Sequence, residues 1–136
     1  MPVKVHIKEQ REVFDRFKAM WTPTQLVLDP DGKELFRIEG FLPADDFLAQ
    51  LEMGLAKIAF EQRHYDEAER RYRAICEQRA GTGAAPEACY WEGVAAYKAT
   101  NDSSYLRQTA DRLKQRYPES EWARKASVWE EPARAA

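Results

Sequence analysis

The chain has 136 residues, of which 44% are hydrophobic and 12% aromatic, enough to build one domain or two small ones and too many for a largely disordered protein. Its 21 basic and 23 acidic residues are spread along the sequence and leave a net charge of −2, so there is no basic field to attract nucleic acid. No stretch approaches the roughly 20 apolar residues of a membrane span, and the first residues lack the apolar core of a signal peptide. The composition therefore predicts a protein that binds neither nucleic acid nor membranes.

The N-terminal segment predicts one strand followed by one helix. Apolar and polar residues alternate over residues 3–7, which is typical of a strand. Over residues 9–20 the apolar residues recur at helical spacing and form a narrow stripe. With the strand that follows, these elements predict a right-handed βαβ crossover.

Residues 25–39 predict a β-hairpin. Two runs rich in β-branched and aromatic residues, 25–29 and 34–39, are joined by Pro30-Asp31-Gly32, and Asp-Gly is a strong turn signal. The first run is apolar on both faces, as expected of an interior strand covered by helices on each side. In the second run Phe36 and Ile38 share one face.

The expected elements follow one another as a helix, Trp21-Thr22-Pro23, an interior strand, an Asp-Gly turn, a second strand, Gly40 and a helix. This order resembles the C-terminal part of the thioredoxin fold. In that family a Thr-Pro or similar dipeptide carries a cis peptide bond before the strand and faces the redox-active CxxC. The resemblance therefore implies a cis bond at Pro23, which X-Pro bonds permit, and a place for Thr22 and Pro23 in a substrate groove. The family's central strand and its CxxC-bearing helix have no counterpart in this sequence.

The chain thus looks like a thioredoxin-fold protein begun late. A mis-assigned start, a shortened chain, or an in-frame stop codon read as selenocysteine would each produce such a sequence. Without the central strand, residues 3–7 and 25–29 lose their common neighbour and leave apolar strand edges open. Either the first strand moves beside residues 25–29, or two copies cover these edges around a two-fold axis; we expect a homodimer.

From residue 44 onward the pattern is helical. Pro43, with acidic residues after it, starts a helix that closes the first unit and opens the second. A turn is expected at residues 63–65, and Asp66 is the expected N-cap of the next helix. Further helices are predicted to begin at residues 86–88 and 120–122, and the Trp and Tyr residues of this half are expected to pack in its core.

The helical part has small and aromatic residues at a regular spacing, among them Ala56, Tyr65, Ala68, Tyr72, Gly93 and Tyr97. This spacing resembles the packing pattern of the tetratricopeptide repeat. Small residues such as Gly93 let a neighbouring helix approach closely, but Arg63 stands where such a repeat usually has Gly. Only about two repeats are present, fewer than the roughly three that are usually needed for independent stability.

The fold class that follows is an α/β unit succeeded by an all-α part. Residues 1–54 are predicted to form a truncated thioredoxin-like β-α-β-β-α domain. Residues 55–130 are predicted to form about two tetratricopeptide-like helical hairpins, and residues 131–136 a disordered tail.

The two cysteines, Cys76 and Cys89, belong to neither a CxxC motif nor a metal-ligand cluster. The simplest interpretation is two buried thiols on facing helices, although packed antiparallel helices could bring them within disulfide reach. His6 and His64 have no carboxylate or Cys placed beside them as a fellow ligand, so both are expected to be structural. The sequence predicts no catalytic residue, no metal site and no cofactor.

Two functions fit these features. The first is a non-catalytic protein-interaction module whose protein or peptide partner is unidentified. The second is the C-terminal part of a thiol–disulfide oxidoreductase whose CxxC or selenocysteine motif lies upstream of Met1, with Pro23 lining its groove. Thiol–disulfide exchange needs a thiolate of lowered pKa and a resolving thiol, so the chain as given is expected to be inactive. A cytoplasmic location is expected, although a natural N-terminal extension could carry a signal peptide.

Overall fold

The computed structural model describes residues 1–130, so the expected tail at residues 131–136 lies outside the described residues. The chain divides into two compact units, Met1–Phe41 and Leu42–Ala136. The first unit contains a pair of strands and the second is helical, which confirms the predicted class of an α/β part followed by helices. The predicted domain boundary after residue 54 falls inside one continuous helix, α2 (Ala44–Glu61).

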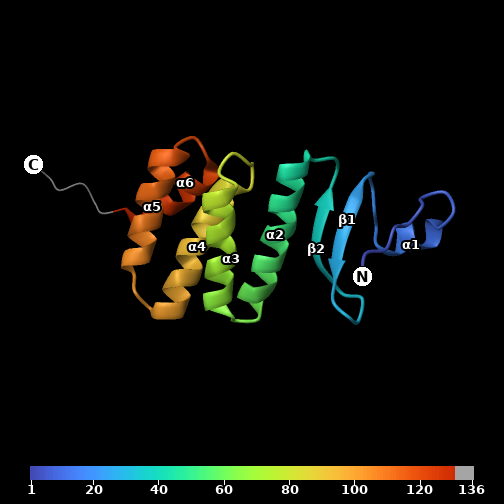
Figure 1. The fold of residues 1–136 in the computed structure, drawn as a ribbon, viewed down its shortest axis with the longest axis horizontal. Coiled ribbons are helices and arrows are strands. Elements are labelled where there is room, and N and C mark those ends of the chain that lie inside the picture. The colour runs from blue at the N-terminus through green and yellow to red at the C-terminus, as the bar shows by residue number, and fades with distance from the viewer. Residues whose placement is uncertain (131–136) are drawn as a thin grey trace, which may run out of the picture. The chain divides into compact units, whose positions relative to one another are not determined.

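The first unit contains α1 (Arg11–Arg16) and a hairpin of β1 (Thr24–Leu28) and β2 (Glu34–Glu39), as Figure 1 shows. The strands are antiparallel, with Val27 opposite Phe36 and an irregularity in the register after Val27. Gly32 has a φ of +85°, a conformation that glycine adopts at little cost. The predicted hairpin and its turn are therefore confirmed.

The carboxylate of Asp29 organises the turn. One of its oxygens, Oδ1, accepts hydrogen bonds from the backbone N–H of Asp31 at 2.9 Å and of Lys33 at 2.8 Å. These bonds hold the chain in the reversal that brings the two strands together.

Two other predictions for this unit are wrong. Residues 3–7 form no strand, and β1 pairs with β2 alone among the described strands, so β1 is not an interior strand. Alternation is a weak signal when no neighbouring strand supplies the ladder of hydrogen bonds. The helix predicted over residues 9–20 is confined to Arg11–Arg16 because Lys18 takes a φ of +53° and ends it.

The Thr22–Pro23 peptide bond is cis, the geometry that the resemblance implied. The N–H of Gly40, which follows β2, donates to the carbonyl of Pro23 at 2.8 Å, so this loop closes against the end of the hairpin. Thr22 and Pro23 are both exposed.

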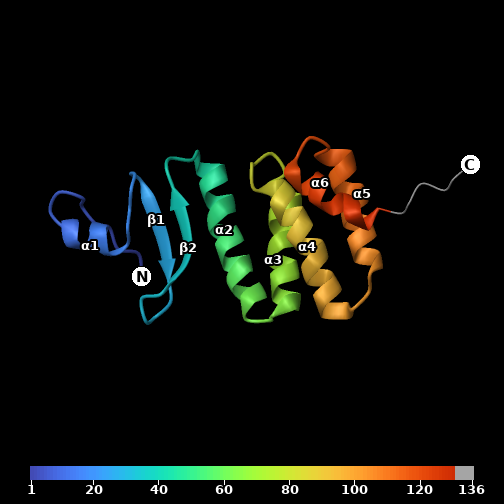
Figure 2. The same ribbon diagram turned by 180° about the vertical axis from the view of Figure 1, so that it is seen from behind.

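The second unit begins with α2 and continues through α3 (Tyr65–Gln78), α4 (Ala85–Thr100) and α5 (Ser104–Arg116) to α6 (Glu121–Ala126) and the short 3-10 helix η1 (Ser127–Trp129). Helix α3 packs against both α2 and α4, and α4 packs against α5 and α6. Figures 1 and 2 show α2, α3, α4 and α5 following one another in this order as two helical hairpins.

The helix ends agree only in part with the sequence predictions. The hydroxyl of Ser120 accepts a hydrogen bond from the N–H of Ala123 at 3.1 Å, so the last helix starts where expected. Asp66, in contrast, is not an N-cap, because α3 already begins at Tyr65 and Asp66 lies in its first turn. An acidic residue there still favours the positive end of the helix dipole.

Small residues dominate the core of the helical unit. Ala56, Ala68 and Ala110 are buried, which allows the helix backbones to approach closely. Larger buried side chains fill the space between α3, α4 and α5, among them Ile75 and Leu113, which are fully buried.

Candidate functional site

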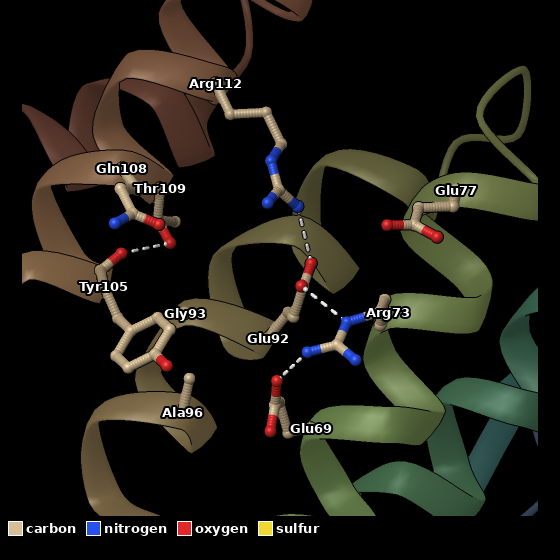
Figure 3. A pocket seen from close by; sticks show the side chains of 10 residues that line it. All are labelled: Glu69, Arg73, Glu77, Glu92, Gly93, Ala96, Tyr105, Gln108, Thr109 and Arg112. Carbon is tan, nitrogen blue, oxygen red and sulfur yellow. Dashed lines mark hydrogen bonds and ion pairs between the residues drawn. The ribbon is translucent and has the colours of Figure 1, made fainter. Parts of the chain in front are cut away.

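A polar hollow of about 180 Å³ lies where α3, α4 and α5 meet (Figure 3). Half of its lining residues are charged, and the others are two small residues of α4 and three polar residues of α5. The lining residues are Glu69, Arg73 and Glu77 from α3, Glu92, Gly93 and Ala96 from α4, and Tyr105, Gln108, Thr109 and Arg112 from α5.

Gly93 allows α4 and α5 to meet at the hollow. A Cβ atom built at Gly93 would lie 1.9 Å from Oγ1 and 2.7 Å from Cβ of Thr109, far inside van der Waals contact. The Thr109 hydroxyl is itself fixed, because it donates to the carbonyl of Tyr105 at 2.8 Å. This contact agrees with the close helix approach that the small residue predicted.

A buried carboxylate links two guanidinium groups at this site. Glu92 is only 7% exposed. Its Oε1 accepts from Nε of Arg73 at 3.3 Å and its Oε2 from Nη1 of Arg112 at 2.6 Å. Arg73 also pairs with Glu69 on its own helix. Figure 3 shows Glu92 between the two arginines, so side chains from three helices form one network.

The network keeps Arg73 charged and pairs the buried carboxylate of Glu92 with two cations. Burial acts to lower the pKa of Arg73, but the carboxylates of Glu69 and Glu92 act against it, and the pKa of Arg73 is raised overall. A buried carboxylate without such partners would be strongly destabilising. Glu92 therefore fixes Arg73 and Arg112 in place, and the two cations neutralise its charge.

Cys76 and Cys89 form a disulfide that joins α3 to α4 beside this network. The interpretation of the two residues as free thiols is therefore wrong, and the alternative that the sequence left open is the one observed. The short connection between α3 and α4 brings the two Cα atoms to 5.0 Å, within disulfide reach. Nη1 of Arg112 lies 3.5 Å from Sγ of Cys76, so the bond borders the charged network directly.

The residues matched to a repeat lie mostly in the packed interior of the helical unit. Ala56 and Ala68 are fully buried and Tyr72 is 3% exposed. Tyr65 is half-buried and meets the ring of Phe60 edge-on at 5.2 Å. Tyr97 is also half-buried, and of the six positions only Gly93 lines the hollow.

The aromatic residues expected in the core of this half are only partly buried, and four of them, Tyr90, Trp91, Trp122 and Trp129, pack against the buried core. Tyr90 stacks on Trp129, with ring centroids 4.8 Å apart, and its ring also contacts Trp122 and Trp91. These rings are half-buried and join α4 to α6 and η1.

Sequence reasoning missed the charged part of the site. In the sequence, the charged runs 67–73 and 112–116 predict solvated helix faces, because exposed ion pairs three or four residues apart have the same pattern. Glu92 could have indicated this charged network, because it is the one charged residue in a stretch that is otherwise apolar from Ala88 to Ala96. Burying a charge is costly unless it is paired, so a single charged residue on such a helix face indicates ion-pair partners on other helices.

Among residues 1–130, no helix is both long enough and apolar enough to cross a membrane. Residues 2–54 match the family model of the thioredoxin-like domain. No curated protein and no solved structure matches the chain. The first unit together with the beginning of α2 is thus thioredoxin-like, and the helices after residue 54 lie outside the matched range.

Proposed function

We propose that this chain is a non-catalytic protein-interaction module, in which tetratricopeptide-like helical hairpins follow a thioredoxin-like part. The observation that carries the proposal is the pair of hairpins, α2–α3 and α4–α5, with a preformed polar hollow on α3, α4 and α5. Stacked helical hairpins present side chains from several helices on one continuous surface, which suits the binding of peptides.

The packing of the hairpins supports a repeat-like arrangement. Ala56, Ala68 and Tyr72 are buried around α2 and α3, and Gly93 fits against Thr109 between α4 and α5. At the turn between α2 and α3, Arg63 has a φ of +63°, the left-handed conformation for which a repeat usually supplies Gly.

The experiment that tests the proposal is a binding screen with the whole chain. A library of short peptides of varied charge is titrated into the ¹⁵N-labelled protein, and the amide signals are followed by NMR. We expect a subset of peptides to shift signals of residues 42–130 in a saturable way. A library that leaves every signal of the helical unit unchanged would overturn the proposal.

The alternative, the C-terminal part of a thiol–disulfide oxidoreductase, is favoured by the match of residues 2–54 to the thioredoxin-like domain. In that case Thr22 and Pro23 would line the substrate groove and the reactive motif would lie ahead of Met1. The genomic sequence preceding Met1 separates the two functions, because an oxidoreductase needs a strand and a CxxC motif, or an in-frame stop codon, at that place.

We also propose that the chain forms a homodimer through its first unit. The outer edge of β1 has no partner strand among the described residues, and large apolar side chains of the unit are exposed. An open strand edge flanked by apolar residues favours pairing with another chain. The most exposed of these side chains are Met1, Val3, Met20, Trp21 and Phe41.

The Cys76–Cys89 disulfide weighs against the cytoplasmic location expected from the sequence. Disulfides persist mainly in oxidising compartments and are rare in the cytosol.

A further inference from the structure

We propose that the hollow between α3, α4 and α5 binds a carboxylate group of a partner, either a chain end or an acidic side chain, and that Arg112 is its main contact. The inference rests on the proposed binding function and specifies the chemistry of the ligand. It follows from how the two arginines use their hydrogen-bond donors.

Arg112 has a free edge that matches a carboxylate. Its Nη1 donates to Glu92 and approaches Cys76, whereas Nε and Nη2 have no acceptor among the described residues. These two nitrogens form the side of the guanidinium that binds both oxygens of a carboxylate in parallel. Glu92 and the disulfide hold the opposite side, so the free edge is fixed before a ligand arrives.

Neighbouring groups supply further donors. Nη1 of Arg73 has no acceptor within the described part of the chain, because this side chain contacts Glu92 through Nε and Glu69 through Nη2. Gln108 lies one helical turn before Arg112 on α5 and also lines the hollow, so its amide can donate to the same ligand.

The size of the hollow limits the ligand to a small group. Its volume of about 180 Å³ lies below the roughly 300–1,000 Å³ that is typical of small-molecule sites. A single side chain or a chain terminus of a peptide suits this volume, which agrees with a protein partner.

The charges of the hollow predict how the affinity for a carboxylate should change when one of them is removed. Glu92 and Glu69 are paired with arginines, but Glu77 at the hollow makes no ion pair or hydrogen bond within the described residues. Its carboxylate repels an anionic ligand and attracts a cationic one. Removing the charge of Glu77 should therefore strengthen the binding of a carboxylate and weaken the binding of an ammonium group.

The test uses three tripeptides and the ¹⁵N-labelled whole chain. One peptide is capped at both ends and carries a central aspartate, one is uncharged except for its free C-terminal carboxylate, and one is capped with a central lysine. We expect at least one of the two carboxylate peptides to shift the Nε–H signal of Arg112 and the amide signal of Gly93 in NMR spectra. The peptide that binds more tightly identifies an acidic side chain or a chain end as the source.

Two substitutions assign the binding to these residues. Arg112→Lys keeps a positive charge beside Glu92 but removes the paired donors, so the affinity should fall about tenfold, as expected when a bidentate contact is lost. Glu77→Gln should raise the affinity about two- to fivefold by removing a nearby like charge. Arg116→Lys, an exposed change on the same helix but outside the hollow, should leave the affinity unchanged. If Arg112→Lys unfolds the chain, Gln108→Ala takes its place and should weaken binding.

The outcomes separate this inference from the proposed function. Binding of the lysine peptide that weakens in Glu77→Gln would overturn the inference in favour of a cation site. Binding of no tripeptide at about 10 mM, which corresponds to less than roughly 3 kcal/mol of binding free energy, would also overturn it. If peptides from the broad library still bind Arg112→Lys as tightly as the wild type, the inference fails while the proposed binding function stands.

Discussion

At the scale of single residues, Arg63 closes α2 in a backbone conformation that suits glycine. Its φ is +63°, its N–H donates to the carbonyl of Phe60 at 3.0 Å, and the N–H of His64 donates to the carbonyl of Ala59 at 2.9 Å. This pair of bonds is the Schellman motif, in which the residue at this position is usually Gly. An Arg there retains the bonds but has the steric cost of a left-handed L-residue.

Replacing Arg63 with Gly should therefore stabilise the chain. The left-handed conformation costs roughly 1–2 kcal/mol for an ordinary residue, and the added freedom of Gly in the unfolded chain returns part of that, so a net gain of about 0.5–1 kcal/mol is expected. Urea unfolding measures the change. Gln62→Gly is the matched control, because Gln62 has a φ of −77° and should lose stability.

Gly93 should tolerate no side chain. In Gly93→Ala the new methyl group would meet Thr109, and overpacking of about 1–3 kcal/mol should exceed the gain of about 1 kcal/mol in helix propensity. A lower urea midpoint is expected, with recovery when Thr109→Gly is added. The comparison is Gly81→Ala, where no heavy atom lies within 4 Å of the new Cβ. A Gly93→Ala chain as stable as the wild type would refute the close contact.

At the scale of elements, Arg37 of β2 ties the hairpin to α1. Its Nη1 donates to the carbonyl of Lys18 at 3.4 Å and its Nη2 to the carbonyl of Phe17, the residues at which the helix ends. The same guanidinium pairs with Glu34 and Glu39 on its own strand. A cation at the C-terminal end of a helix also favours the negative pole of the helix dipole.

The contact between Arg37 and Glu34 predicts that the stability of the fold depends on pH. The hydrogen bond from Arg37 lowers the pKa of Glu34, with the charge of Arg37 adding to it and partial burial opposing it. A lowered pKa means that this contact stabilises the fold above the ordinary pKa of Glu34 and is lost as the pH falls through the lowered value. In Arg37→Gln the pKa of Glu34 should rise toward 4.5, which NMR titration of its side-chain carboxyl carbon measures. An unchanged titration would contradict the contact.

The hairpin and the helices could be predicted because their signals are local. Asp31-Gly32 specifies the turn, and Ser120 and Pro43 mark helix starts, so each element is determined by residues near it in sequence. The strand predicted at residues 3–7 does not form, because alternation is a local signal and a strand needs a partner for its backbone groups. The site was half-predictable: Gly93 indicates close helix packing, but the pairing of Glu92 with arginines of two other helices depends on tertiary contacts.

At the scale of the whole molecule, the two units differ in how much core they have. Ile38, at 7% exposed, is the one buried hydrophobic residue of the first unit within the described part of the chain, whereas the helical unit has a continuous core. Hydrophobic burial is the main force that stabilises a fold. The first unit is therefore expected to gain stability from association.

We expect sedimentation equilibrium at micromolar concentration to give a dimer rather than the 15.8 kDa monomer. Leu28→Lys should weaken the dimer, because Leu28 is an exposed residue at the end of β1 and a charge there disfavours strand pairing. Arg70→Lys, an exposed change in the helical unit, serves as the control. A monomer over the whole concentration range would rule out the proposed assembly.

The central claim, that the chain as given acts through protein contacts and not through thiol–disulfide exchange, is tested most directly by an insulin-reduction assay with dithiothreitol. Both cysteines of the sequence are joined in a buried disulfide, so neither offers the accessible thiolate that the exchange needs. The account predicts that purified protein precipitates insulin no faster than dithiothreitol in buffer. A rate above that background, proportional to protein concentration and lost in Cys76→Ser, would contradict it.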